Sequence, residues 1–116
     1  MGEQYLRAWV RGWPGLETEV KWQDDLVFSV AGKMFGVLCL RGATAGNLSF
    51  KVEEHRFLEL TERPGFIPAP YLARARWVQV AARAPVAATE LRDLLRCSYE
   101  LVRARLPKGT QRDLAD

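Results

Sequence analysis

The middle of the chain, residues 16–52, constrains the fold most, because it contains four short strand-like segments separated by tight connections. Residues 16–22 and 48–52 alternate between apolar or hydroxyl side chains and charged or polar ones, which is the period-two pattern of a half-buried strand. The apolar runs over residues 26–30 and 34–40 are typical of central strands. Turn-forming residues join the segments, so we predict four consecutive antiparallel strands in a meander.

One helix is predicted before the meander and a shorter one after it. Apolar residues recur at helical spacing over residues 5–13, and Pro14-Gly15 then ends the helix by removing a backbone donor. Residues 53–60 begin with two acids and continue with apolar residues at helical spacing, which favours a short helix. Residues 63–70 contain three prolines and cannot continue that helix, so they are expected to form an ordered loop.

The C-terminal third adds one strand and one long helix. Residues 77–80 alternate as a strand does, and Pro85 lies beyond its end. Thr89 is positioned to cap a helix whose apolar stripe runs to Leu106. Residues 110–116, which follow it, are expected to be a frayed tail.

The order of these elements predicts a single α+β domain over residues 1–116. A chain of 116 residues can bury one core without disulfides, and a hydrophobic fraction of 48% is that of an ordinary globular protein. No run of eighteen apolar residues occurs, and the N-terminal residues lack a basic start followed by an apolar run. We therefore expect a cytoplasmic protein without membrane association, and a monomer rather than an obligate oligomer.

Residues with the chemistry of a catalytic or metal site are few and scattered. Cys39 and Cys97 lie in separate apolar stretches and are expected to be reduced and buried. His55, the single histidine, follows Glu53 and Glu54, but adjacent residues of a helix point in different directions and do not converge on a metal. We therefore predict no enzymatic activity, no cofactor and no metal site.

Positive charge is concentrated in the C-terminal half of the chain. The formal net charge is +3, and residues 63–105 contain eight arginines against three acids. Residues 63–83 contain four arginines and no acid, which would create a local positive field for a polyanion. The alternative is a solvated basic surface without a partner.

Two motifs in the C-terminal half resemble those of the MmcQ/YjbR family. Residues 63–80, RPGFIPAPYLARARWVQV, resemble the family's proline-glycine loop, the basic residue after it and the strand that begins with tryptophan. Residues 94–102, with the pair Ser98-Tyr99, resemble the family's closing helix. Residues 32–35 fit its hairpin, so the resemblance extends over nearly the whole chain.

This resemblance implies both a fold and a function. The implied fold is two-layered and CyaY-like, with the N- and C-terminal helices packed on one side of an antiparallel sheet of about five strands. The implied function is DNA binding, often described as that of a double-wing protein. One departure is Ala73-Arg74, where the family pattern often has Asn-Lys, so that the charge is kept and the amide is lost.

The basic residues and the resemblance together favour a nonenzymatic module that binds DNA with low specificity through phosphate contacts. The candidate site contains basic residues and one aromatic residue: Lys33, Lys51, Arg63, Tyr71, Arg74 and Arg76. Arg74 and Arg76 are expected on one face of an extended segment that leads into the Trp77 strand. The alternative is a module that binds another protein or a small ligand through the sheet face or through residues 66–68.

Overall fold

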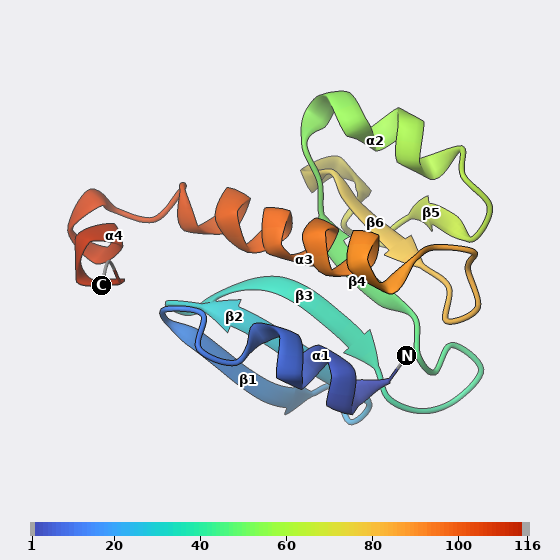
Figure 1. Cartoon of the computed structure of the whole chain (residues 1–116), viewed down its shortest axis with the longest axis horizontal. Helices are drawn as coiled ribbons and strands as arrows, with labels where there is room; N and C mark the ends of the chain where they lie inside the picture. Colours follow the sequence, from blue (N-terminus) through green and yellow to red (C-terminus); the bar gives the residue numbers. More distant parts are fainter. Residues whose placement is uncertain (1, 115–116) are drawn as a thin grey trace.

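The four predicted strands form an antiparallel meander in the computed structural model, which describes residues 2–114 (Figure 1). They are β1 (Leu16–Lys21), β2 (Asp25–Val30), β3 (Lys33–Cys39) and β4 (Leu48–Lys51). Each strand pairs with the next, and the register between β2 and β3 shifts at a bulge between Phe28 and Ser29. The prediction of a meander is therefore confirmed.

Two further strands extend the sheet beyond β4. β6 (Trp77–Val80) pairs antiparallel with β4, and β5 (Phe66–Pro68) pairs antiparallel with β6 at the edge. The strand order is β1-β2-β3-β4-β6-β5. The expectation of a loop throughout residues 63–70 is therefore wrong for three residues, because an edge strand tolerates a proline that donates no backbone hydrogen bond.

Helices cover one face of this sheet. α1 (Glu3–Val10) and α3 (Ala88–Arg103) cross the same side of the strands, and α2 (Glu54–Thr61) packs on β5 and β6 (Figure 1). This arrangement confirms the two-layer α+β fold, with six strands in the sheet. Within residues 2–114, no helix combines the length and the apolar composition needed to cross a bilayer.

The chain continues after α3 into a further short helix, α4 (Lys108–Leu114). Leu114 is partly buried against the hydrophobic core and lies beside Gly15, the residue that precedes β1. Residues 110–114 are thus helical rather than frayed as expected, because a distant contact holds their end. Residues 115–116, the rest of the expected tail, lie outside the described residues.

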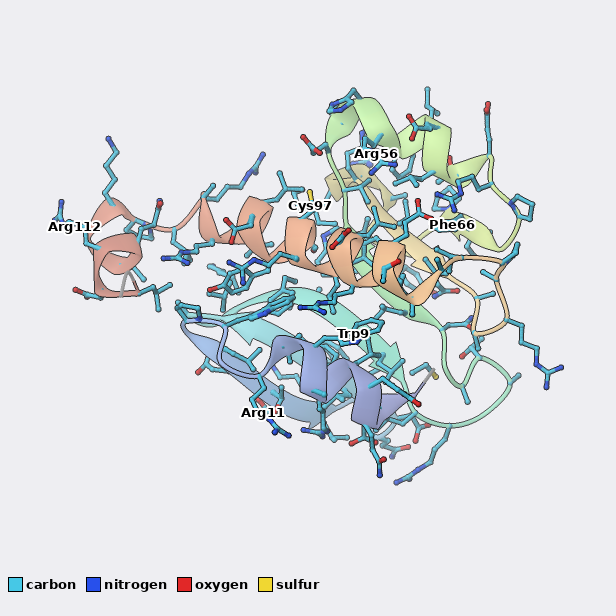
Figure 2. All side chains as sticks on the ribbon, viewed as in Figure 1. Trp9, Arg11, Arg56, Phe66, Cys97 and Arg112 are labelled. Atoms are coloured by element: carbon cyan, nitrogen blue, oxygen red, sulfur yellow. The ribbon has the colours of Figure 1, made fainter. Side chains whose placement is uncertain are left out.

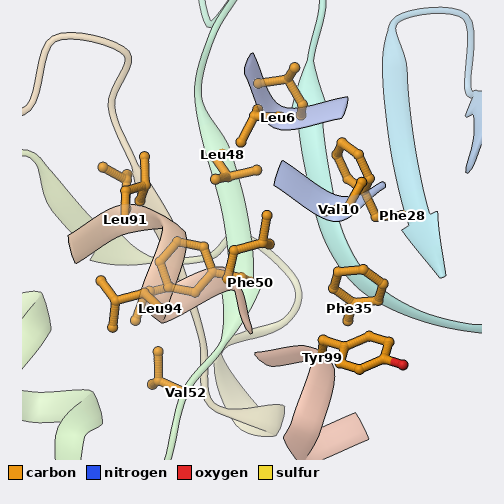
Figure 3. Packing of buried hydrophobic residues seen from close by; sticks show 14 of the residues in the cluster. Leu6, Val10, Phe28, Phe35, Leu48, Phe50, Val52, Leu91, Leu94 and Tyr99 are labelled. Carbon is orange, nitrogen blue, oxygen red and sulfur yellow. The ribbon is translucent and has the colours of Figure 1, made fainter. Parts of the chain in front are cut away.

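The core fills the space between the sheet and the helices (Figure 3). One part of the core is an aromatic cluster around Tyr99 of α3. The Tyr99 side chain is fully buried. The Tyr99 ring lies 5.3 Å from that of Phe35 and 5.1 Å from that of Trp13. Its hydroxyl donates a hydrogen bond to the Pro14 carbonyl, which satisfies the polar end of the ring and fixes α3 to the chain entering β1.

A second buried polar group, the Ser98 hydroxyl, joins α3 to the middle of the sheet. It donates a hydrogen bond of 2.6 Å to the Phe35 carbonyl and accepts one of 2.9 Å from the Lys51 N–H. Ser98 is fully buried, so water cannot replace either bond. Its position explains why a hydroxyl stands within an otherwise apolar helix stripe.

The sheet face opposite α1 and α3, which we call the open face, has a different composition. The register places Val27, Val37, Ser49 and Gln79 in one row on it. Gln79 Nε2 donates to Ser49 Oγ at 3.5 Å. This row is therefore apolar on β2 and β3 and polar on β4 and β6, and two hollows lie on this face.

Replacing Ser98 with alanine is expected to destabilise the fold by about 1–3 kcal/mol, because the Phe35 carbonyl and the Lys51 N–H lose their buried partner. Urea denaturation of Ser98→Ala measures this loss. Ser29→Ala, which changes a half-buried serine of β2, serves as the matched control and should cost less than about 0.5 kcal/mol. Equal midpoints for Ser98→Ala and the unaltered protein would contradict the bridging role.

Leu95→Ala is expected to cost about 2–5 kcal/mol, because Leu95 is fully buried at the centre of the α3 stripe and its loss leaves a cavity. Leu95 fits against the surface that Gly36 leaves free on β3. Thermal unfolding compared with Arg92→Ala, an exposed change on the same helix, measures the difference. Equal melting temperatures for the two variants would contradict the buried position of Leu95 on α3.

Candidate nucleic-acid interface

Arg63 is held by an acid that is distant in the sequence. Its two terminal nitrogens lie 2.6 and 2.9 Å from the two carboxylate oxygens of Glu90, and its guanidinium lies 4.8 Å over the Phe66 ring. The hydrogen bonds from Arg63 lower the pKa of the Glu90 carboxyl, so this acid stays ionised. Arg63 is therefore neutralised locally and does not present a free charge to a phosphate.

Arg76 is also paired, and its backbone differs from the expected extended form. Residues Ala73–Ala75 form a 3₁₀ turn, η1, and Arg76 ends it in a left-handed conformation with φ of 62°. Its Nε lies 2.7 Å from Glu54 Oε2, and its guanidinium lies 5.3 Å over the Phe57 ring. The expectation that Arg74 and Arg76 share one face of an extended segment is wrong, because the chain turns between them.

Lys33 and Lys51 both line a groove at one end of the sheet. The third cation of this groove is Arg105, which follows the last turn of α3. Apolar side chains complete the groove, which has a volume of about 390 Å³ and which we call the basic groove: Met34, Trp77, Val102, Leu106 and Pro107. The candidate site did not include Arg105, because a basic residue near the C-terminal end of a helix is favoured there by the helix dipole alone.

The environment of Lys51 is that of a cation close to other cations. Burial lowers the pKa of its ammonium group, Arg105 and Arg76 lower it further, and Glu54 opposes the change. The Lys51 Nζ donates one hydrogen bond, to the Ala75 carbonyl. An anion bound in the groove would relieve the repulsion that these cations exert on one another.

The remaining two candidates lie apart from this groove. Tyr71 is fully exposed and has a φ of 67°, and it lines a hollow on the open face together with Trp22. Arg74 is exposed on η1. The six predicted residues therefore do not form one site: two are paired with acids, two enter the basic groove, and two lie elsewhere.

Residues with catalytic or metal-binding chemistry are dispersed in the fold. Across residues 2–114, no three His, Cys, Asp or Glu side chains are grouped closely enough to hold a metal ion. His55 is exposed on α2, and Ser98 uses its hydroxyl for the two backbone bonds described above.

Both cysteines are free, and each is half-buried rather than fully buried as expected. Cys39 Sγ lies 3.1 Å from the Arg41 carbonyl oxygen. Cys97 points toward the start of α2, where its Sγ lies 3.7 Å from Glu53 Oε1 (Figure 2). Burial raises the pKa of the Cys97 thiol, and the Glu53 carboxylate adds to this effect.

Comparison with known proteins identifies relatives of this fold. A family model described as YjbR matches residues 11–101. The crystal structure of Deinococcus radiodurans protein DR2400, described as a DUF419 domain, aligns with a TM-score of 0.84 and 28% identity, over 96% of this chain and 86% of that one. A Pseudomonas syringae protein aligns with a TM-score of 0.72 and 21% identity, over 87% and 98% of the two chains, and indicates the fold alone. No curated protein matches the chain.

Native Cys97 is expected to react with a maleimide about tenfold or more slowly at neutral pH than the same cysteine in the urea-unfolded chain, because a raised thiol pKa reduces the thiolate fraction. Labelling of a Cys39→Ser variant isolates Cys97. Glu53→Gln removes the neighbouring charge and should increase the native rate. Equal native and unfolded rates would contradict this account.

Proposed function

The chain belongs to the YjbR family, and we propose that it acts as a nonenzymatic module that binds DNA with low sequence specificity through the basic groove. The observation that carries this proposal is the convergence of Lys33, Lys51 and Arg105. Within the described residues, the groove has no acidic side chain in its lining. Phosphate is the ligand group that this arrangement favours, because several cations can then share one chain of negative charges.

The surroundings of Lys51 also support an anionic ligand, because burial and the nearby Arg105 lower the pKa of its ammonium group. A bound phosphate would stabilise the ammonium form of Lys51 and offset its partial burial. The same phosphate would reduce the repulsion between Lys51 and Arg105. The groove is therefore poised to gain free energy from binding an anion, whereas Arg63 and Arg76 would have to leave Glu90 and Glu54 first.

Low specificity follows from the kinds of residues in the groove. Two of its three cations are lysines, which contact phosphates as point charges. Among its lining residues in the described part of the chain there is one arginine and no asparagine or glutamine, the side chains that most often read base edges. Trp77 is only 5% exposed, so its ring cannot serve as an open platform on which bases stack. With about three phosphate contacts, binding should be weak and should depend on salt with a logarithmic slope of about −3.

The second candidate function is the binding of a small ligand or another protein. The observation that favours it is the hollow on the open face, where Trp22 and Tyr71 are exposed beside half-buried polar groups. This hollow differs from the basic groove in charge and in location, so the two functions do not exclude each other.

Fluorescence anisotropy with a short labelled duplex of mixed sequence tests the DNA proposal at about 50 and 200 mM salt. The Lys33→Gln, Arg105→Gln double variant should weaken binding and reduce the salt slope by about two units, because it removes two of the three expected phosphate contacts. Its preference among duplex sequences should not change.

The matched control is the Arg83→Gln, Arg92→Gln double variant, which loses the same amount of positive charge. Both arginines are exposed: Arg83 precedes α3, and Arg92 lies in its second turn. The salt slope of this control should stay close to that of the unaltered protein. Equal losses in the two variants would assign binding to net charge rather than to the groove. Salt-independent or absent binding in the unaltered protein would exclude the proposal.

A further inference from the structure

The hollow on the open face that Trp22 and Tyr71 line, which we call the open-face groove, has a volume of about 490 Å³. Its floor comes from the central strands, and its rim comes from the β1–β2 turn, the β3–β4 loop and the segment before η1. It is separate from the basic groove except at Met34, which lines both. This size is in the range of sites that hold small molecules.

Two exposed aromatic side chains stand at the rim of this groove. Trp22 is 64% exposed and Tyr71 is fully exposed, although leaving a large aromatic ring in water costs free energy. Both residues have positive φ, at 51° and 67°, a left-handed conformation that bulky residues rarely adopt. The fold thus holds two rings at one groove in positions that neither burial nor backbone preference favours.

The groove contains one carboxylate without a counterion. Asp25 lines it, and within residues 2–114 no ion pair engages this side chain. The adjacent carboxylate of Asp24 lies 3.8 Å from Arg41, and the cross-strand neighbour Lys21 lies 3.9 Å from Glu19. Burial, with a smaller contribution from Asp24, raises the pKa of the Asp25 carboxyl, as expected for an acid that lacks a cationic partner.

The other polar groups of the groove are already engaged with each other. Asn47 Nδ2 donates to Gln79 Oε1 at 3.3 Å, and Asn47 Oδ1 accepts a bond of 3.0 Å from the Ala82 N–H. Gln79 in turn donates to Ser49. No lysine, arginine or histidine lies among the lining residues in the described part of the chain. The unmet interaction in this groove is therefore that of the Asp25 carboxylate.

We propose that the open-face groove binds a small organic amine, whose ammonium group pairs with Asp25 beside the rings of Trp22 and Tyr71 and whose apolar body lies on the floor of the groove. A cation is attracted to the faces of aromatic rings as well as to a carboxylate, so both features select the same charge. The apolar residues of the floor, Met34 and Val37, suit a hydrocarbon or aromatic body. This binding does not depend on the proposed DNA binding.

A charge series of one shape tests the proposal: phenethylamine, 2-phenylethanol and phenylacetate are titrated into ¹⁵N-labelled protein and followed by amide chemical shifts. The amine should bind at least roughly tenfold more tightly than the alcohol, and the carboxylate should give no saturable shift. The shifting amides should belong to residues of this groove, such as Asp25, Thr44 and Gln79.

Asp25→Asn should reduce the affinity for phenethylamine roughly tenfold, to that of the alcohol, while leaving the urea midpoint close to its original value. Glu17→Gln is the matched control, because it removes a carboxylate from the same face of the sheet, outside this groove and without freeing Lys21, and it should change the affinity by less than about twofold. Tyr71→Leu keeps apolar area but removes the ring, and should weaken amine binding more than alcohol binding.

The Lys33→Gln, Arg105→Gln variant should bind the amine as the unaltered protein does, which separates failure of this proposal from failure of the DNA proposal. The proposal is overturned if phenethylamine gives no saturable shift, if all three probes bind alike, or if Asp25→Asn binds the amine normally. A different result would be a shift of the same amides as the protein concentration rises without any probe. That result would show that the open face binds a second copy of the chain, and it would also overturn the proposal.

Discussion

The Ser98 hydroxyl determines how the helical layer and the sheet fit together. Backbone pairing between β3 and β4 stops at Gly36 and Phe50, and the groups that follow, the Phe35 carbonyl and the Lys51 N–H, both bond to Ser98 instead. A buried serine in α3 thus takes the place of the next step of the ladder, which would otherwise leave two buried polar groups unpaired. The strand ends separate there, and the basic groove lies at these ends, between Lys33, Lys51 and the residues after α3.

The parts of the fold that the sequence predicted are those specified by local patterns. Alternation and turn residues predicted the meander, because each strand there pairs with its neighbour in sequence. The strand at Phe66–Pro68 was missed, because it exists only through pairing with β6 and its proline favours a loop in isolation. The helix at Lys108–Leu114 was missed for a similar reason, since its stabilising contact is Leu114 against the core, near Gly15. Thr89 does not cap α3, which begins at Ala88 with Ala87 at the cap position.

The candidate site was less predictable, because it depends on which charges meet in space. A stretch with four arginines and no acid indicated a free positive surface, yet Glu90 and Glu54 reach two of those arginines from other elements. Such pairs join residues 27 and 22 positions apart, and no local rule specifies them. Lys33 and Lys51 were predicted from their charge, whereas their convergence with Arg105 required the position of α3 on the sheet.

Ion pairing therefore leaves a charge distribution that differs from the one the composition suggests. Locally neutralised pairs contribute little beyond a Debye length of about 8 Å, so the field that a ligand meets comes mainly from side chains without a partner. These side chains have opposite signs in two neighbouring grooves, with Lys51 in one and Asp25 in the other, and Met34 lies between them. An anion in the basic groove and a cation in the open-face groove would attract each other. This attraction would weaken as the salt concentration increases, and neither groove requires the other to be occupied.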